Sequence, residues 1–127
     1  MGDRYNQACA VLSQLGAYSC YDGFSQAAYA AAICAKEPER LHSLIVRVYM
    51  ETAAHYGTSW MAVEQNISQI GGMLWANNRA GVDALFGFSM GQEPTAALLV
   101  AALASALGRK STPGGKGGNA NAESARV

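Results

Sequence analysis

Residues 58–75 constrain the fold of this chain more than any other stretch, because their apolar side chains recur at the spacing of an α-helix. Members of the apolar stripe are separated by three or four positions, and they are Trp60, Val63, Ile67, Ile70 and Leu74. A hydroxyl at Thr58 or Ser59 can cap the N-terminus of this helix, and Gly57 suits the left-handed residue that ends a preceding one. The pattern therefore predicts a helix that buries one side and is entered through a tight turn.

The opposite face of the predicted helix is polar and carries no Lys or Arg. Its residues are Ala62, Gln65, Asn66 and Gln69, with Glu64 and Ser68 at the margins. Amide side chains can form paired hydrogen bonds with adenine, whereas guanine is read best by arginine, and cations that neutralise phosphates supply much of the affinity for DNA. The amides of this face could therefore still read adenine, but the face lacks cations that attract phosphates. A polar helix face that simply meets solvent explains the same residues.

A longer set of motifs follows the same stretch in a fixed order. The motifs are Tyr56, Gly57, Thr58 and Ser59 at the turn, Val63 with Glu64 and Ile67, then Trp75, Asp83, Leu85 with Phe86 and Gly87, and finally Pro94 with Thr95. In this order and spacing, residues 8–107 resemble the C-terminal effector domain of the stage zero sporulation regulator (sporulation initiation factor A) of spore-forming Firmicutes. The resemblance implies a compact all-helical bundle of about six helices that binds promoter DNA through a helix-turn-helix and often pairs on DNA through neighbouring domains.

The resemblance also implies which residues face DNA. The matched positions are Ser59, Ala62, Glu64, Gln65, Asn66, Ser68 and Gln69. In the family, arginines and a histidine occupy the positions of Ala62, Gln65, Ser68 and Gln69, and of the charged residues only Glu64 is retained. Two functions follow. The first is a DNA-binding transcription regulator of sporulation or similar gene expression in a Firmicutes-type bacterium, and the second is a degenerate helix-turn-helix that binds protein without binding DNA.

The rest of the chain favours helices and contains little that favours strands. We expect helices over residues 5–15, 24–35 and 82–86, with Gly16 ending the first and Pro38 marking a boundary before the third. The third helix, which would support the recognition helix, has an inward stripe of Leu41, Leu44, Ile45, Val48 and Thr52. Pro94 and Thr95 open the last helix.

Two glycines, Gly71 and Gly72, lie inside the predicted recognition helix. Each glycine costs about 1 kcal/mol relative to alanine in a helix interior. They therefore indicate either the close approach of a neighbouring helix or a bend or early end.

The last helix is apolar nearly all round, since its large side chains spread over most of its circumference. They are Leu98, Leu99, Val100, Leu103 and Leu107. We expect part of this surface to form a weak homodimer, because a two-fold interface uses one patch twice. The alternative is a helix wedged deep in a small domain.

Charge and composition divide the chain into a domain at residues 1–107 and a flexible Gly-, Ser- and Lys-containing tail at residues 108–127. The domain has five cations and eight anions, a net charge of −3, whereas the tail has a net charge of +3. A mildly acidic body attracts nucleic acid poorly. Double-stranded DNA is nevertheless the expected partner, bound weakly.

The sequence offers little for catalysis or metal binding. His42 and His55 are tied to no nucleophile by spacing, and the three cysteines form no ligand motif, so we expect no enzyme activity, cofactor or metal. The cysteines are expected to be unoxidised and largely buried in a reducing cytoplasm. The chain is also too short for the family's receiver domain. No secretory signal is apparent, and the apolar run at residues 96–107 is too short for a bilayer, so we expect a cytoplasmic protein with no membrane contact.

Overall fold

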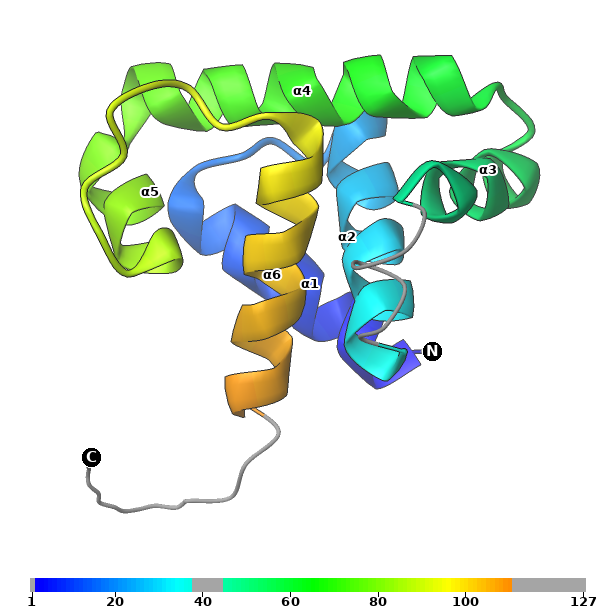
Figure 1. Cartoon of the computed structure of the whole chain (residues 1–127), viewed down its shortest axis with the longest axis horizontal. Helices are drawn as coiled ribbons and strands as arrows, with labels where there is room; N and C mark the ends of the chain where they lie inside the picture. The colour runs from blue at the N-terminus through cyan, green and yellow to red at the C-terminus, as the bar shows by residue number, and fades with distance from the viewer. Residues whose placement is uncertain (1, 38–44, 111–127) are drawn as a thin grey trace.

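The computed structural model describes residues 2–37 and 45–110, which form six α-helices and, within those ranges, no strand (Figure 1). In chain order the helices are α1 (Gly2–Leu15), α2 (Asp22–Lys36), α3 (Ile45–Tyr56), α4 (Trp60–Asn77), α5 (Arg79–Phe86) and α6 (Ala96–Lys110). The expected all-helical bundle is confirmed. Leu41, Leu44, Pro38 and His42 lie outside the described residues, as do the tail residues beyond Lys110.

Helix α2 is the centre of the bundle and packs against α1, α3, α4 and α6. Six of its fifteen residues are alanines, and five of these are buried, as are Gly23, Phe24 and Ile33. Small side chains let several neighbouring helices approach one axis closely, which a helix with a single apolar stripe does not allow. The alanine-rich stretch of the sequence is thus the hub of the fold.

Helix α4 lies across the ends of α2 and α6 (Figure 1). Both crossings depend on glycine. A Cβ atom at Gly23 would clash with the backbone carbonyl of Asn66, and one at Gly71 would lie 3.2 Å from the carbonyl oxygen of Pro94. The packing interpretation of Gly71 is therefore confirmed, and α4 continues without a break to Asn77.

Helix ends follow the residues that terminate or cap them. Gly16 and Gly57 adopt left-handed φ angles of 104° and 70°, as a helix end requires. The hydroxyl of Ser59 accepts a hydrogen bond of 3.1 Å from the backbone N–H of Ala62, so Ser59 rather than Thr58 caps α4. Thr95 caps α6 in the same way, through the N–H of Leu98.

Helix α5 begins at Arg79, earlier than expected from the apolar residues alone. The cause is Asn78, whose side-chain oxygen accepts a 3.0 Å hydrogen bond from the N–H of Gly81 and whose amide donates a 2.9 Å bond to the carbonyl of Leu15. Asn78 therefore ends α4, starts α5 and ties both to the end of α1. Asparagine favours such cap positions because its side chain replaces a missing backbone partner.

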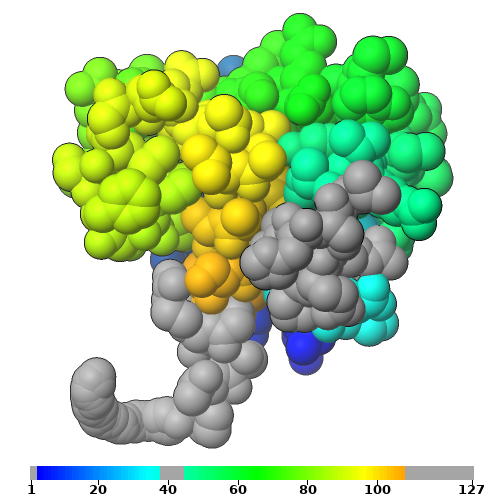
Figure 2. Space-filling model, in the orientation of Figure 1, coloured from blue at the N-terminus to red at the C-terminus, as the bar shows by residue number. Residues whose placement is uncertain are grey.

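The structure does not support the expected dimer surface on α6. Four of its five residues are buried inside the chain's own core: Leu99, Val100, Leu103 and Leu107. Only Leu98 remains substantially exposed, at 46%. Helix α6 packs against α1, α2, α4 and α5, so its neighbours cover most of its circumference. Figure 2 shows only a strip of α6 at the surface, between α5 and α3. The alternative, a helix wedged deep in the domain, describes the structure.

The cysteines correct a second expectation. Cys34 is buried and Cys9 is half-buried, but Cys20 is exposed in the turn between α1 and α2. The cysteines form no disulfide within the described ranges. Over residues 2–37 and 45–110, no three His, Cys, Asp or Glu side chains gather in a group that could hold a metal ion. No helix in this part of the chain is long and apolar enough to cross a membrane.

Candidate nucleic-acid interface on helix α4

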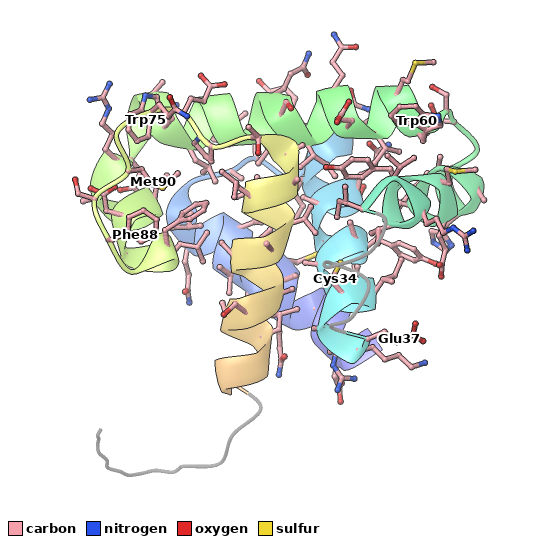
Figure 3. All side chains as sticks on the ribbon, in the orientation of Figure 1. Cys34, Glu37, Trp60, Trp75, Phe88 and Met90 are labelled. Atoms are coloured by element: carbon pink, nitrogen blue, oxygen red, sulfur yellow. The ribbon has the colours of Figure 1, made fainter. Side chains whose placement is uncertain are left out.

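Helices α3 and α4 pack against each other and are joined by the short turn at residues 57–59. The inner side of α4 is buried as its sequence predicts, because Val63, Ile67, Ile70 and Leu74 are at most 1% exposed. The two tryptophans lie at opposite ends of α4, and side chains between them project away from the bundle (Figure 3). The long outward side of α4 is thus held rigidly and left open.

An aromatic cluster holds the C-terminal end of α3, directly before the turn. His55 stacks on Tyr29 of α2 with ring centroids 4.3 Å apart, and the ring of Tyr56 makes T-shaped contacts with both. The hydroxyl of Tyr56 donates a 3.3 Å hydrogen bond to the carbonyl of Ser25. Burial and the side chain of Tyr56 raise the pKa of Tyr5 on α1, so the Tyr5 hydroxyl stays protonated. These contacts fix where the turn, and hence the start of α4, lies on α2.

The family-matched positions differ in solvent exposure. Those with exposed side chains are Ser59, Glu64, Gln65 and Gln69, and the half-buried ones are Ala62, Asn66 and Ser68. The hydroxyl of Ser59 is already used as the cap of α4. Gln65 and Gln69 lie one turn apart on the outward stripe, and neither has a hydrogen-bond partner among the described residues. They are the exposed amide side chains of this face that remain available to a ligand.

Asn66 departs from the expected open face. Its amide nitrogen donates a 3.1 Å hydrogen bond to the side-chain oxygen of Gln26, which is only 5% exposed. A buried amide without such a partner is costly, so each of these two side chains stabilises the other. The sequence patterns did not single out Gln26, although a glutamine in an alanine-rich buried helix is a signal that could have identified it.

The charges around this face are mainly negative. Glu64 is exposed on α4 itself. The carboxylate of Glu93 lies over Gly72, with one oxygen 3.0 Å from where a Cβ would stand. Arg79 stacks over the ring of Trp75, its guanidinium carbon 4.4 Å from the ring centroid, at the far end of the helix. The C-terminal half of α4 is therefore partly covered, and its N-terminal half is the more open.

A shallow groove of about 440 Å³ runs beside the outward stripe. Tyr21 and Asp22 line one wall, at the start of α2, and Gln69 and Met73 line the other. Tyr21 is exposed and lies 6.1 Å from the ring of Tyr18. Residues distant in sequence create this groove, so helical periodicity could not predict it. It leaves open space beside the amide of Gln69.

Tyr49 lies in the core of the bundle, on α3. Its side chain is completely buried, and its hydroxyl has no hydrogen-bond partner in the described part of the chain. Burial, together with the carboxylate of Glu64 and the thiol of Cys34, raises the pKa of Tyr49 to about 12. The folded chain therefore binds the proton of Tyr49 more tightly than the unfolded chain does.

This pKa shift predicts a loss of stability in alkali. An unfolded tyrosine releases its proton near pH 10, so the contribution of Tyr49 is complete below pH 10 and is lost as the pH rises to about 12. Between pH 8 and pH 11, we expect the free energy of unfolding to fall by about 1 kcal/mol more in the wild type than in Tyr49→Phe. Urea titrations at the two pH values measure this difference.

Tyr18→Phe is the matched control for the alkaline prediction, because Tyr18 is 60% exposed. It should lose stability in alkali as the wild type does. Equal losses for the wild type and Tyr49→Phe would show that the buried hydroxyl does not control the alkaline transition.

The comparisons with known proteins agree with this geometry at the level of the family. No curated protein matches the chain. Residues 8–107 match the family model described as Sporulation initiation factor Spo0A C terminal. The match covers most of the chain: it spans all of α2 to α5, the second half of α1 and most of α6. The chain therefore belongs to the family of Spo0A C-terminal domains, which are DNA-binding domains of sporulation regulators and not enzymes.

Proposed function

We propose that this chain binds duplex DNA through the N-terminal half of α4, with α3, the turn and α4 acting as a helix-turn-helix in a cytoplasmic regulator of sporulation or related genes. The observation that carries the proposal is the open outward stripe of α4 on a helix whose inner side is buried from Val63 to Leu74. In helix-turn-helix proteins, the N-terminal residues of the second helix contact base edges in the major groove. The N-terminal half of α4 is also the more open half in this structure.

The neighbouring elements support such docking. Helix α3 braces α4 from one side, and the aromatic cluster around Tyr56 holds the turn in place. An interface of this kind needs a rigid scaffold, because base reading depends on hydrogen bonds of fixed geometry. Glu93 lies over Gly72 and disfavours phosphate contact only near the C-terminal half of α4.

A second candidate function is binding to protein without DNA. The observation that favours it is electrostatic, because α4 carries no Lys or Arg and the exposed Glu64 is its charged side chain. A surface without cations that exposes a methionine, Met61, suits a protein partner as well as it suits a DNA groove. The two functions differ in whether DNA is bound at all, which a single titration decides.

We expect DNA binding to be weak and to depend only shallowly on salt. The slope of log affinity against log salt concentration is about −0.9 per neutralised phosphate. Because α4 supplies no cation, we expect the slope to be smaller in magnitude than about 3, corresponding to roughly three phosphates or fewer. Fluorescence anisotropy of the full chain with labelled duplexes, at about 50 to 200 mM salt, measures this slope.

The control for this titration is a full-length variant in which Arg109, Lys110, Lys116 and Arg126 are replaced by glutamine. If the slope is steep and persists in this variant, cations of the domain itself bind the phosphates and the proposed neutral docking face is wrong. If no duplex binds at the lowest salt concentration, the chain acts through protein contacts instead.

A further inference from the structure

The three amides on or beside the outward face of α4 are not equivalent. Asn66 is occupied by its hydrogen bond to Gln26, whereas Gln65 and Gln69 are exposed and have no partner in the described residues. A side chain that already bonds within the fold must break that bond before it reads a base, and its buried partner then loses its own hydrogen bond. Gln65 and Gln69 bear no such cost.

The spacing of the two free amides fits adjacent bases. Residues four apart lie on the same side of a helix, about 6 Å apart along its axis at 1.5 Å per residue. Successive bases on one DNA strand are about 3.4 Å apart. A helix lying in the major groove would therefore bring Gln65 and Gln69 to base edges within about two base pairs of each other. The groove beside Gln69 leaves its side chain space to extend toward a base.

The chemistry of a primary amide selects the base. Glutamine can donate to N7 and accept from the N6 amino group of adenine at the same time, which no other base matches in the major groove. The arginine that reads guanine is missing from this face. We propose, on the basis of the DNA-binding function above, that Gln65 and Gln69 select duplexes with two adenines within about two base pairs, and that Asn66 is a positioning residue that holds α4 on Gln26.

Because α4 has no cations, the base contacts of Gln65 and Gln69 should determine which DNA sequence is bound. Phosphate contacts raise affinity for every sequence alike, whereas base contacts raise it for one sequence. With few phosphate contacts, a larger share of the binding free energy comes from the two amides. Discrimination between sites is therefore expected to be strong relative to the total affinity.

Selection from random duplexes with the full chain at low salt identifies the preferred site. The enriched sites should share two adenines within about two base pairs. Substituting 7-deaza-adenine at either position removes N7 but keeps the base pair. This change removes one of the two hydrogen bonds of the paired contact. It should weaken binding severalfold, with an upper limit of roughly 150-fold set by the ~1–3 kcal/mol carried by the whole contact.

Single substitutions assign each adenine to its reader. Gln65→Ala should abolish sensitivity to 7-deaza-adenine at one position and leave it at the other, and Gln69→Ala should do the reverse. Gln14→Ala is the matched control, because Gln14 is also exposed but lies on α1. It should change neither affinity nor sensitivity.

Asn66→Ala separates positioning from reading. As a positioning residue, it should weaken binding to every site evenly while both 7-deaza sensitivities persist, and the exchange Gln26→Asn with Asn66→Gln should restore affinity. If Asn66→Ala instead removes one of the sensitivities, Asn66 reads a base and the assignment is wrong. Enriched sites without paired adenines, or sites indifferent to 7-deaza-adenine, would overturn the inference while DNA binding stands. If no duplex binds, the proposed function fails and the inference fails with it.

Discussion

Replacing Ala62 and Gln65 together with arginine should strengthen binding to duplex DNA that lacks the adenines read by Gln65 at least tenfold at low salt. Both positions lie on the part of α4 that we propose to meet DNA, and the starting face has no cation. One paired arginine–guanine contact is worth about 1–3 kcal/mol, and tenfold in affinity corresponds to about 1.4 kcal/mol. The slope of log affinity against log salt should become steeper by up to about 2, since two phosphates can be neutralised.

A matched control separates the position of the new charges from their number. Asn6 and Ala10 are exposed on α1, which is not among the main neighbours of α4, so Asn6→Arg with Ala10→Arg adds the same net charge elsewhere. This control should raise affinity much less. If both double variants bind equally tightly, bulk charge explains the gain. If neither arginine on α4 alters affinity while the chain still binds DNA, the outward face of α4 does not contact it.

Gly23→Ala should destabilise the fold by about 2 kcal/mol, measured as a lower midpoint in urea or thermal unfolding. The added Cβ would clash with the carbonyl of Asn66 and lie 2.8 Å from a side-chain carbon of Ile70, so α2 and α4 would have to separate. Overpacking of this kind costs about 1–3 kcal/mol. Alanine recovers only part of that cost through its higher helix propensity, so the net effect remains a loss.

Gly91→Ala is the control for this prediction, because a Cβ at Gly91 meets nothing within 4 Å. It should alter the free energy of unfolding by less than about 0.5 kcal/mol. Gly23→Ala should also weaken DNA binding, since it displaces the segment of α4 that carries Gln65 and Asn66. An unchanged unfolding midpoint in Gly23→Ala would mean that the crossing of α2 and α4 is looser than the structure indicates.

The apolar spacing of α4 was sufficient to predict its buried side, and the hydroxyls of Thr58 and Ser59 indicated its capped start. Helical periodicity reports which residues share a face, and a single buried stripe leaves little freedom in how such a helix packs. The turn at Gly57 and the cap at Ser59 were equally local, because each depends on a residue and its near neighbours. The start of α5 was not predicted, because Asn78 both ends α4 and caps α5, and apolar spacing indicates only where the first of these helices stops.

The candidate interface was predicted less completely than the fold. The sequence placed Gln65, Asn66 and Gln69 on one face, but it could not reveal that Gln26 occupies the amide of Asn66. That bond joins residues forty positions apart, so it exists only once α2 and α4 cross. The carboxylate of Glu93 over Gly72 is likewise a contact between α4 and the segment before α6. Local patterns carry no information about such partners.

Helix α6 shows which features the sequence specifies and which depend on the tertiary structure. The sequence by itself determined that residues 96–107 form an apolar helix, because composition and spacing specify which side chains avoid water. Whether those side chains meet a second copy or the chain's own core depends on how many neighbours surround the helix, which spacing does not encode. Packing against α1, α2, α4 and α5 buries Leu99, Val100, Leu103 and Leu107. The tertiary structure alone decided this, because burial is a property of all the surrounding helices together.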